Sequence, residues 1–316
     1  MTEGPKLGKV ISIAAKCILV AAAIYVGVFF GLIYANKNNA KAVAPATVAE
    51  ATATVATTTL PISKPFTILV VPGHDTDSGG AHFRDIYERD VVVTIANKIS
   101  DTLNAEAGYK VIVARNTKTW NPILQNYFDS EEQSIIDFKN QHQAADKALM
   151  ASGQKQFVPD MASHSEVNQK SAIELYGINK WVNENDIDLV IHLHFNDSER
   201  PNSNAPGFYN GFTMFIPEKQ MANSSTSRAI ARDISAEIKK SFAPEAVGND
   251  PDGLIEDQSL IALGASGTLE KPATLIEYGY IYDKDLWTEQ DREKTLTEMA
   301  ARTVAGIEDY VSSIKK

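Results

Sequence analysis

Two histidines and two glutamates of this chain have the residue types and positions that metal-assisted hydrolysis requires. His74 lies in VPGHD, Glu88 in IYERDVV, His194 in HLHFND and Glu277 in LIEYG. A catalytic zinc ion is held by about three His or carboxylate ligands and keeps one position open for water. A nearby carboxylate then takes a proton from that water and returns it to the leaving amine. The four residues therefore predict a metal-dependent hydrolytic site.

The composition narrows the possible ligands and partners. Cys17 is the only cysteine of the 316 residues, so a disulfide within the chain and a cysteine-based zinc site are both excluded. The formal net charge is −10, and no basic block or stripe of basic and aromatic residues is present. We therefore expect no nucleic-acid partner.

Apolar runs that alternate with helical patterns predict the elements that must position the four residues. Such a pattern is typical of an α/β layered domain with a central, mostly parallel sheet flanked by helices. Functional groups in these sheets gather beyond the carboxyl ends of the strands. His74, His194 and Glu277 all fall at such ends, and Glu88 would open the first helix, from which it can turn back toward His74. The predicted strands are 66–71, 109–114, 188–194, 211–216 and 273–277, and the predicted helices lie at 91–103, 175–182, 230–238 and 291–313.

Several short motifs in this order resemble the zinc-dependent N-acetylmuramoyl-L-alanine amidases of the type-3 class, over about residues 66–315. The motifs are Pro72-Gly73-His74, Gly80-Ala81 before Glu88, Asp188 leading to His194-Phe195-Asn196, Ser227 to Ala231, and Pro272 to Tyr280. No single motif is specific, because P-G-H alone occurs by chance. Their order and their positions at strand ends and helix starts carry the resemblance.

The resemblance implies a role for each of the four residues. His74, Glu88 and His194 would ligate zinc, and Glu277 would be the general acid and base. The substrate would be peptidoglycan, cut between N-acetylmuramic acid and L-alanine during cell-wall remodelling or division. A zinc peptidase acting on stem peptides stays open, because the same chemistry serves both amides. A non-catalytic wall-binding protein on the same fold is a further alternative.

Three positions depart from the pattern of the resembling family. Residues 75–79 read DTDSG in place of a glycine-rich segment, His192 replaces a common serine, and Glu174 lies where an arginine is often found. His192 and His194 point to the same face of a strand, since side chains alternate with period two. His194 is nearer the strand end and is the better ligand, so we expect His192 to be a buried supporting or core histidine. The departures affect substrate fit and leave the ligand set complete.

The N-terminal region predicts a membrane anchor. Residues 17–35 contain no charge, and as a helix they would span roughly 28 Å, close to the thickness of the hydrocarbon core. Three lysines within residues 1–16 favour a cytoplasmic tail before a single transmembrane signal-anchor. The catalytic domain would then be extracytoplasmic. A cleaved signal peptide stays open, because Ala40-Lys41-Ala42 resembles a cleavage site.

Two further segments complete the predicted organisation. Residues 36–64 are rich in Ala and Thr and predict an extended linker to a catalytic domain at 65–316. That domain carries an insertion at about 116–169, part of which has a helical pattern. Long insertions in compact domains are often functional. This one either restrains access to the zinc, through Glu131 or Glu132 and under the control of an activator protein, or is a surface elaboration.

Overall fold

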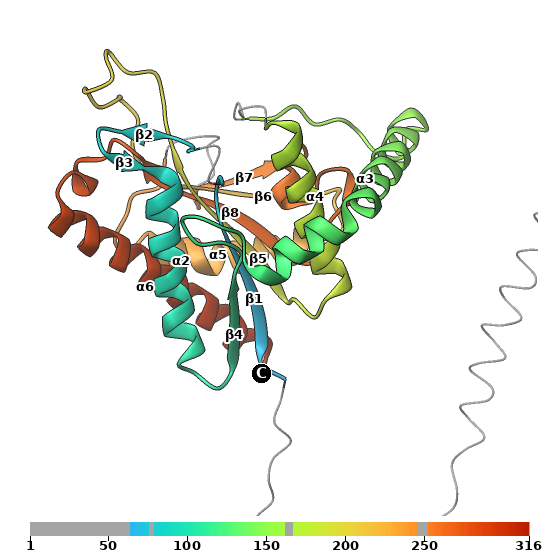
Figure 1. The fold of residues 1–316 in the computed structure, drawn as a ribbon, viewed down its shortest axis with the longest axis horizontal. Helices are drawn as coiled ribbons and strands as arrows, with labels where there is room; N and C mark the ends of the chain where they lie inside the picture. The colour runs from blue at the N-terminus through green and yellow to red at the C-terminus, as the bar shows by residue number, and fades with distance from the viewer. Residues whose placement is uncertain (1–63, 76–78, 162–166, 246–251, 316) are drawn as a thin grey trace, which may run out of the picture. The chain divides into compact units, whose positions relative to one another are not determined.

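The computed structural model describes residues 64–75, 79–161, 167–245 and 252–315, which fall in one compact unit (Figure 1). The predicted cytoplasmic tail, the transmembrane segment 17–35 and nearly all of the linker lie outside the described residues. Within the described ranges, no helix is both long and apolar enough to cross a membrane.

A mostly parallel sheet forms the centre of the described unit. Among the described residues it has six strands in the order β4-β1-β5-β8-β6-β7, and only the β6–β8 pairing is antiparallel. The strands are β1 (Phe66–Pro72), β4 (Tyr109–Val113), β5 (Leu189–Asn196), β6 (Thr213–Pro217), β7 (Leu254–Asp257) and β8 (Ala273–Tyr280). The predicted α/β class and its mostly parallel sheet are confirmed. The sequence analysis missed β7, a strand of only four residues, and did not identify which pairing is antiparallel.

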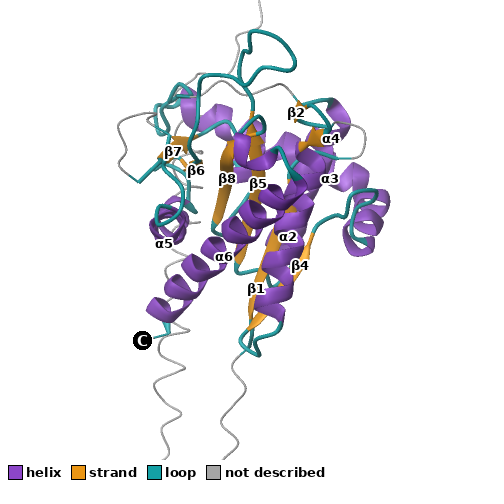
Figure 2. Cartoon of the chain, turned by 90° about the vertical axis from the view of Figure 1, so that its left-hand side faces the viewer, coloured by secondary structure: helices purple, strands orange, loops and turns teal. Residues whose placement is uncertain are grey.

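Helices cover both faces of this sheet (Figures 1 and 2). One face packs against α2 (Glu88–Asn104), α5 (Ser224–Ile238) and α6 (Glu289–Ile314), and the other against α3 (Pro122–Ala151) and α4 (Gln169–Glu184). Along β1, Ile68 and Val70 belong to the first core, while Leu69 and Val71 belong to the second. A strand buried on both faces needs a continuous apolar run, which explains the sequence FTILVV. Three short 3-10 helices, η1 (Ile261–Leu263), η2 (Ala265–Gly267) and η3 (Lys284–Leu286), complete the fold.

The carboxyl ends of β1, β5 and β8 lie side by side. Pro72 pairs with Leu193, and His194 pairs with Glu277. Beyond β1 the chain forms the small hairpin of β2 (His82–Phe83) and β3 (Ile86–Tyr87), and α2 begins at the next residue, Glu88. The hairpin therefore returns the first turn of α2 to the edge of the sheet where β1 ends.

The predicted insertion is mainly one long helix, α3, which lies outside α4 (Figure 1). Its first turn is capped by the side chain of Asn121, which accepts a hydrogen bond from the Ile123 backbone N–H. Leu124, Phe128 and Ile135 are its buried residues, and they join the core that α4 forms with the sheet. The helix is thus docked by a narrow apolar stripe, and most of its other side chains are exposed or half-buried.

Gly306 permits the close crossing of α5 and α6. A Cβ atom at Gly306 would lie 2.7 Å from the Ile234 backbone nitrogen and 2.9 Å from the Asp233 carbonyl oxygen. Backbone atoms of a packed helix cannot move aside cheaply, so Gly306→Ala should lower the free energy of unfolding by about 1–3 kcal/mol. Denaturant titration measures the loss. Gly108→Ala is the control, because its nearest neighbour would be the Lys315 Nζ at 3.8 Å. Equal unfolding midpoints for both variants would contradict the helix crossing.

Candidate metal centre

His74, Glu88 and His194 come together at the carboxyl edge of the sheet. Their ligand atoms all lie within 4.8 Å of one another. The Glu88 carboxylate sits between the two imidazoles, with Oε2 at 2.9 Å from His74 Nε2 and Oε1 at 3.0 Å from His194 Nδ1. The structure thus brings together the three residues that the sequence analysis proposed as ligands, from the loop after β1, from α2 and from β5.

The Glu88 carboxylate is fixed from four directions. Its side chain is only 2% exposed, and besides the two imidazoles it accepts hydrogen bonds from the Ala81 N–H at 2.8 Å and the Phe195 N–H at 3.0 Å. Burial by itself would raise the pKa of Glu88. The hydrogen bonds and charges of His194 and His74 outweigh burial and hold that pKa well below its usual range. The carboxylate is therefore ionised and oriented, as a metal ligand must be.

The loop that carries His74 has an unusual backbone conformation. His74 adopts a φ of 63°, in the left-handed region that a residue with a Cβ occupies at a cost of roughly 1–3 kcal/mol. Gly80, with φ 66°, passes so close that a Cβ there would lie 2.5 Å from Glu88 Oε2 and 2.6 Å from His74 Nε2. The Gly80-Ala81 motif therefore has a physical reason: the glycine leaves room for both ligands, and the Ala81 N–H binds one of them.

Arg115 holds the backbone on which the same loop begins. This buried residue lies two positions beyond the end of β4 and donates from Nε to the Pro72 carbonyl at 3.1 Å and from Nη2 to the Gly73 carbonyl. Nη2 also donates to the carbonyl of Arg89, in the first turn of α2, at 3.0 Å. Burial lowers the pKa of Arg115 to about 10, so it stays charged at neutral pH. One guanidinium thus joins the strand end before His74 to the helix start at Glu88.

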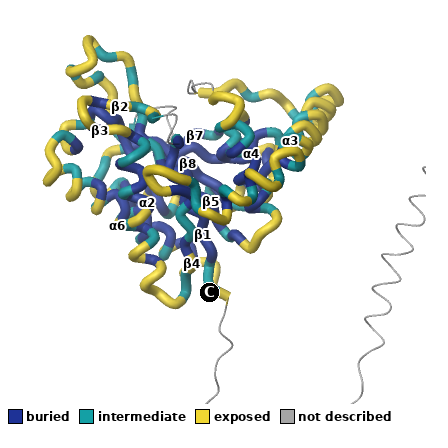
Figure 3. The backbone as a smooth tube through the Cα atoms, in the orientation of Figure 1, coloured by how far each residue is buried: buried dark blue, intermediate teal, exposed yellow. Residues whose placement is uncertain are grey.

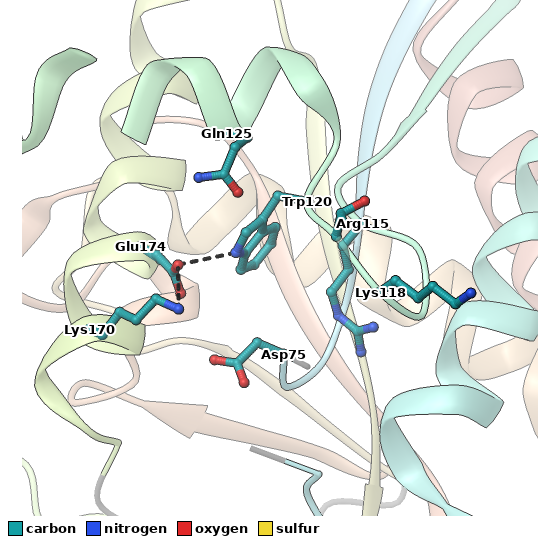
Figure 4. Close-up of a pocket in the computed structure, with 8 residues that line it drawn as sticks. Asp75, Arg115, Lys118, Trp120, Gln125, Lys170 and Glu174 are labelled. Carbon is teal, nitrogen blue, oxygen red and sulfur yellow. Dashed lines mark hydrogen bonds and ion pairs between the residues drawn. The ribbon is translucent and has the colours of Figure 1, made fainter. Parts of the chain in front are cut away.

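A cavity of about 140 Å³ lies beside Asp75, the residue after His74 (Figure 4). Glu174 lines it, accepting a hydrogen bond from Trp120 Nε1 at 3.2 Å and lying 3.9 Å from Lys170 Nζ. Asp75 Oδ2 accepts a hydrogen bond from the Ser171 hydroxyl at 2.9 Å. Asp75, the first residue of one departing segment, and Glu174, the other departure, therefore line the same cavity, whose walls carry charges of both signs.

Glu277 lies on β8 directly beside His194 on β5. Its Oε2 is buried and has no hydrogen-bond partner among the described residues. Burial, together with the negative charges of Glu88 and Glu245, raises the pKa of Glu277 well above its usual value. A buried carboxyl group that binds a proton strongly and lies next to the ligand group can act as a general base and acid.

His192 and the insertion lie outside the ligand group. His192 is buried, and burial lowers its pKa to about 3, so it is neutral and adds no charge to the centre. Helix α3 contributes no carboxylate to the group formed by the described residues. Glu132 is exposed on a helix that is docked on the α4 side through Leu124, Phe128 and Ile135. The expected blocking of the metal by Glu131 or Glu132 is therefore not the arrangement in this structure.

The three ligand residues fit a zinc ion. Two imidazoles and one carboxylate form the ligand set of many catalytic zinc sites, which leave a further position for water or substrate. The close spacing of the ligand atoms and the ionised state of Glu88 meet this requirement.

Comparisons with known proteins agree with the fold and with the family that the sequence motifs resemble. Residues 68–309 match the N-acetylmuramoyl-L-alanine amidase family (Amidase_3). No curated protein matches the sequence significantly. The CwlD amidase from Clostridioides difficile, solved in complex with the GerS lipoprotein, is 17% identical with a TM-score of 0.51, over 78% of this chain and 98% of that chain. The amidase Ami1 from Mycobacterium smegmatis is 14% identical with a TM-score of 0.48, over 80% and 99% of the two chains. The likeness to the first structure supports the fold.

Arg115 gives a test of how the ligands are positioned. Arg115→Ala leaves the carbonyls of Pro72 and Gly73 without their donor, and it should weaken metal affinity about 10- to 100-fold, the usual effect of losing a group that orients ligands. Competition with a chelator measures this affinity. Arg115→Lys keeps the positive charge but lacks the several N–H donors of the guanidinium, and it should give an intermediate loss of metal affinity. Lys118→Ala removes an exposed cation three residues away and should bind metal like the wild type. Unchanged metal affinity in Arg115→Ala would rule out the positioning role.

Proposed function

The chain belongs to the N-acetylmuramoyl-L-alanine amidase family, and from this we propose that it hydrolyses its substrate with a zinc ion held by His74, Glu88 and His194. Membership confirms the predicted enzyme class, an amidase acting on peptidoglycan. One observation carries the zinc proposal. The three ligand atoms meet beside Glu277, whose buried Oε2 has no hydrogen-bond partner among the described residues.

The chain's own residues divide the work of hydrolysis. Zinc bound at this place would act as a Lewis acid toward the substrate carbonyl and toward water. Glu88 stays ionised because two imidazoles and two backbone N–H groups stabilise its charge. Glu277 Oε2 would take the proton of the attacking water and deliver it to the nitrogen of the leaving L-alanine. The water oxygen becomes bonded to the lactyl carbonyl carbon, and the C–N bond breaks.

The environment of Glu277 suits this proton transfer. Its raised pKa makes its carboxylate a stronger base than an exposed glutamate, and the same group, once protonated, is the acid that the leaving amine needs. Among the described residues, no hydrogen bond holds Glu277 Oε2 away from substrate. The non-catalytic alternative is disfavoured, because all four residues of the proposed mechanism are present and assembled or adjacent.

The bond that is cut distinguishes the amidase from the zinc-peptidase alternative. Digested peptidoglycan analysed by mass spectrometry should contain free stem peptides that begin with alanine. Shortened stems that remain attached to the glycan would instead identify a peptidase.

We also propose that residues 17–35 anchor the enzyme in a membrane, with the catalytic domain on the extracytoplasmic side. The support is the uncharged run of nineteen residues preceded by lysines. Cell fractionation should recover the enzyme with membranes, and removal of residues 1–36 should release it. A mature chain that begins at Val43 would show instead that a signal peptide is cleaved after Ala42.

We further propose that an activator protein acts on the insertion at 116–169. The CwlD amidase was solved in complex with the GerS lipoprotein. In this chain, the long and largely exposed helix α3 offers a surface to which an activator protein could bind. Leu149 is exposed on this helix. If an activator binds there, Leu149→Glu should reduce release of stem peptides in cells and leave the activity of the purified enzyme unchanged. Equal activity of variant and wild type in cells would count against this surface.

Substitution of Glu277 separates catalysis from metal binding. Glu277→Gln keeps the shape of the side chain but cannot accept the proton, so turnover should fall about 10²-fold or more while zinc content stays at one per chain. His194→Ala removes a ligand and should empty the site. Metal analysis and peptide release from peptidoglycan are measured on the purified full-length protein. Near-normal hydrolysis by Glu277→Gln would assign the proton transfer to another group, and full zinc content in His194→Ala would refute the ligand set.

A further inference from the structure

Three tyrosines form a stack that leads from the core to the surface near the metal centre. The rings of Tyr282 and Tyr280 stack with centroids 5.2 Å apart, and those of Tyr280 and Tyr209 with centroids 6.1 Å apart. Tyr282 and Tyr280 are 3% and 6% exposed, whereas Tyr209 is 59% exposed, and its neighbour Phe208 is 84% exposed. We call Tyr209, Tyr280 and Tyr282 the aromatic stack. Its inner rings are buried, and its outer ring faces solvent.

The loop that carries the exposed rings is held in place. Residues 197–212 project above β2 and β3, where Figure 3 shows them largely exposed. The Tyr282 hydroxyl donates to the Tyr209 carbonyl at 3.2 Å and lies 2.7 Å from the Ser198 hydroxyl oxygen. Arg200 donates to the His82 carbonyl at 3.2 Å and lies over the Phe83 ring. Phe208 and Tyr209 are therefore presented by an ordered loop, although exposed aromatic rings gain no burial energy in the free protein.

The aromatic stack is continuous with the proposed catalytic site. Tyr280 follows Glu277 by three residues on β8 and pairs with Asn196 on β5. The Tyr280 hydroxyl donates to Glu245 Oε1 at 2.7 Å, and Glu245 Oε2 accepts from the Thr213 hydroxyl at 3.1 Å. Thr213 in turn pairs with Glu277 across β6 and β8. A ligand that stacks on Tyr209, the outer ring, would thus lie at the same end of β8 as Glu277, the proposed proton-transfer group.

The surroundings of the metal centre differ in chemistry from one side to the other. The tyrosines at 280 and 282 belong to the core shared with α2 and α6, while the charged cavity beside Asp75 is lined from α4 and from the segment between β4 and α3. The substrate that the proposed function implies has two unlike halves, a sugar that carries the lactyl group and a peptide that carries charges.

We propose that Phe208 and Tyr209 form a platform that binds the glycan strand by stacking against the apolar face of an N-acetylated sugar ring.

The chemistry of the platform favours a sugar over a lipid surface or a protein. A pyranose ring offers a flat C–H face to an aromatic ring and keeps its hydroxyl groups in water at the edges. Tyrosine suits such a partner, because it has an apolar face and a polar tip. A membrane or a protein partner would have no reason to be bound at the strand end of Glu277, whereas the sugar of the scissile bond must lie within one lactyl group of it. The inference rests on the proposed function for this last step.

Binding of a sugar chain without peptide tests the platform directly. The probe is N,N′,N″,N‴-tetraacetylchitotetraose, titrated into the zinc-loaded full-length protein by calorimetry or by ligand-observed NMR. Tyr209→Ala and Phe208→Ala should each weaken binding about tenfold, corresponding to about 1.4 kcal/mol for one lost ring contact. Tyr209→Phe keeps the ring and should bind like the wild type. Phe157→Ala is the matched control, because it removes a ring that is 69% exposed from the segment between α3 and α4.

The outcomes separate the platform from the proposed function. Weakened sugar binding in both alanine variants, with unchanged zinc content and unchanged binding by Phe157→Ala, supports the platform. Sugar binding that is absent in the wild type, or equal in all variants, overturns it, as does a selective loss of binding to anionic lipid vesicles. If the wild type binds the sugar through these rings but releases no stem peptide, the proposed function fails and the glycan platform stands.

Discussion

The site depends on the hydrogen bonds and ion pairs that surround the buried carboxylate of Glu88. The carboxylate accepts hydrogen bonds from the hairpin at Ala81 and from β5 at Phe195, and it contacts the imidazoles of His74 and His194. An ionised group with so little exposure is tolerated only when its charge is compensated from several sides. The strand ends of β1 and β5, the hairpin and the start of α2 must all be in place for that compensation. The metal ligands are therefore assembled by the same contacts that close this edge of the sheet.

This assembly places strain at His74 and balances it with Arg115. A non-glycine residue in the left-handed region costs roughly 1–3 kcal/mol, so the surrounding contacts must determine that conformation. Arg115 supplies them by binding the carbonyls of Pro72 and Gly73 immediately before the strained residue. Because the same guanidinium also binds the Arg89 carbonyl, a shift of α2 would move Arg115 and with it the backbone before His74. The geometry of two ligands is thus coupled through one side chain that binds the backbone next to each of them.

The sequence predicted the parts of the structure that depend on local pattern and failed where distant segments meet. Apolar runs located the strands that carry His74, His194 and Glu277, because a strand buried on both faces must be apolar throughout. The role of Arg115 was not predictable from its own surroundings, since the carbonyls it binds lie 42 and 43 residues earlier in the chain. Its position just beyond a predicted strand was the only available signal. Likewise, no periodicity relates Tyr209 to Tyr280, which meet only in the folded chain.

The direction of β6 explains why the exposed aromatic loop lies at the catalytic edge. A parallel β6 would start at the opposite edge of the sheet, and its connection from β5 would need a crossover across one face. The observed antiparallel pairing of β6 with β8 starts β6 at Thr213, beside Glu277 and close to where β5 ends at Asn196. Residues 197–212 can therefore join the two strands without leaving that edge. Because this segment does not have to cross the sheet, it can carry Phe208 and Tyr209 at the edge where β8 ends, and Tyr209 stacks there on Tyr280. One reversed strand thus brings the exposed aromatic rings to the same edge of the sheet as Glu277.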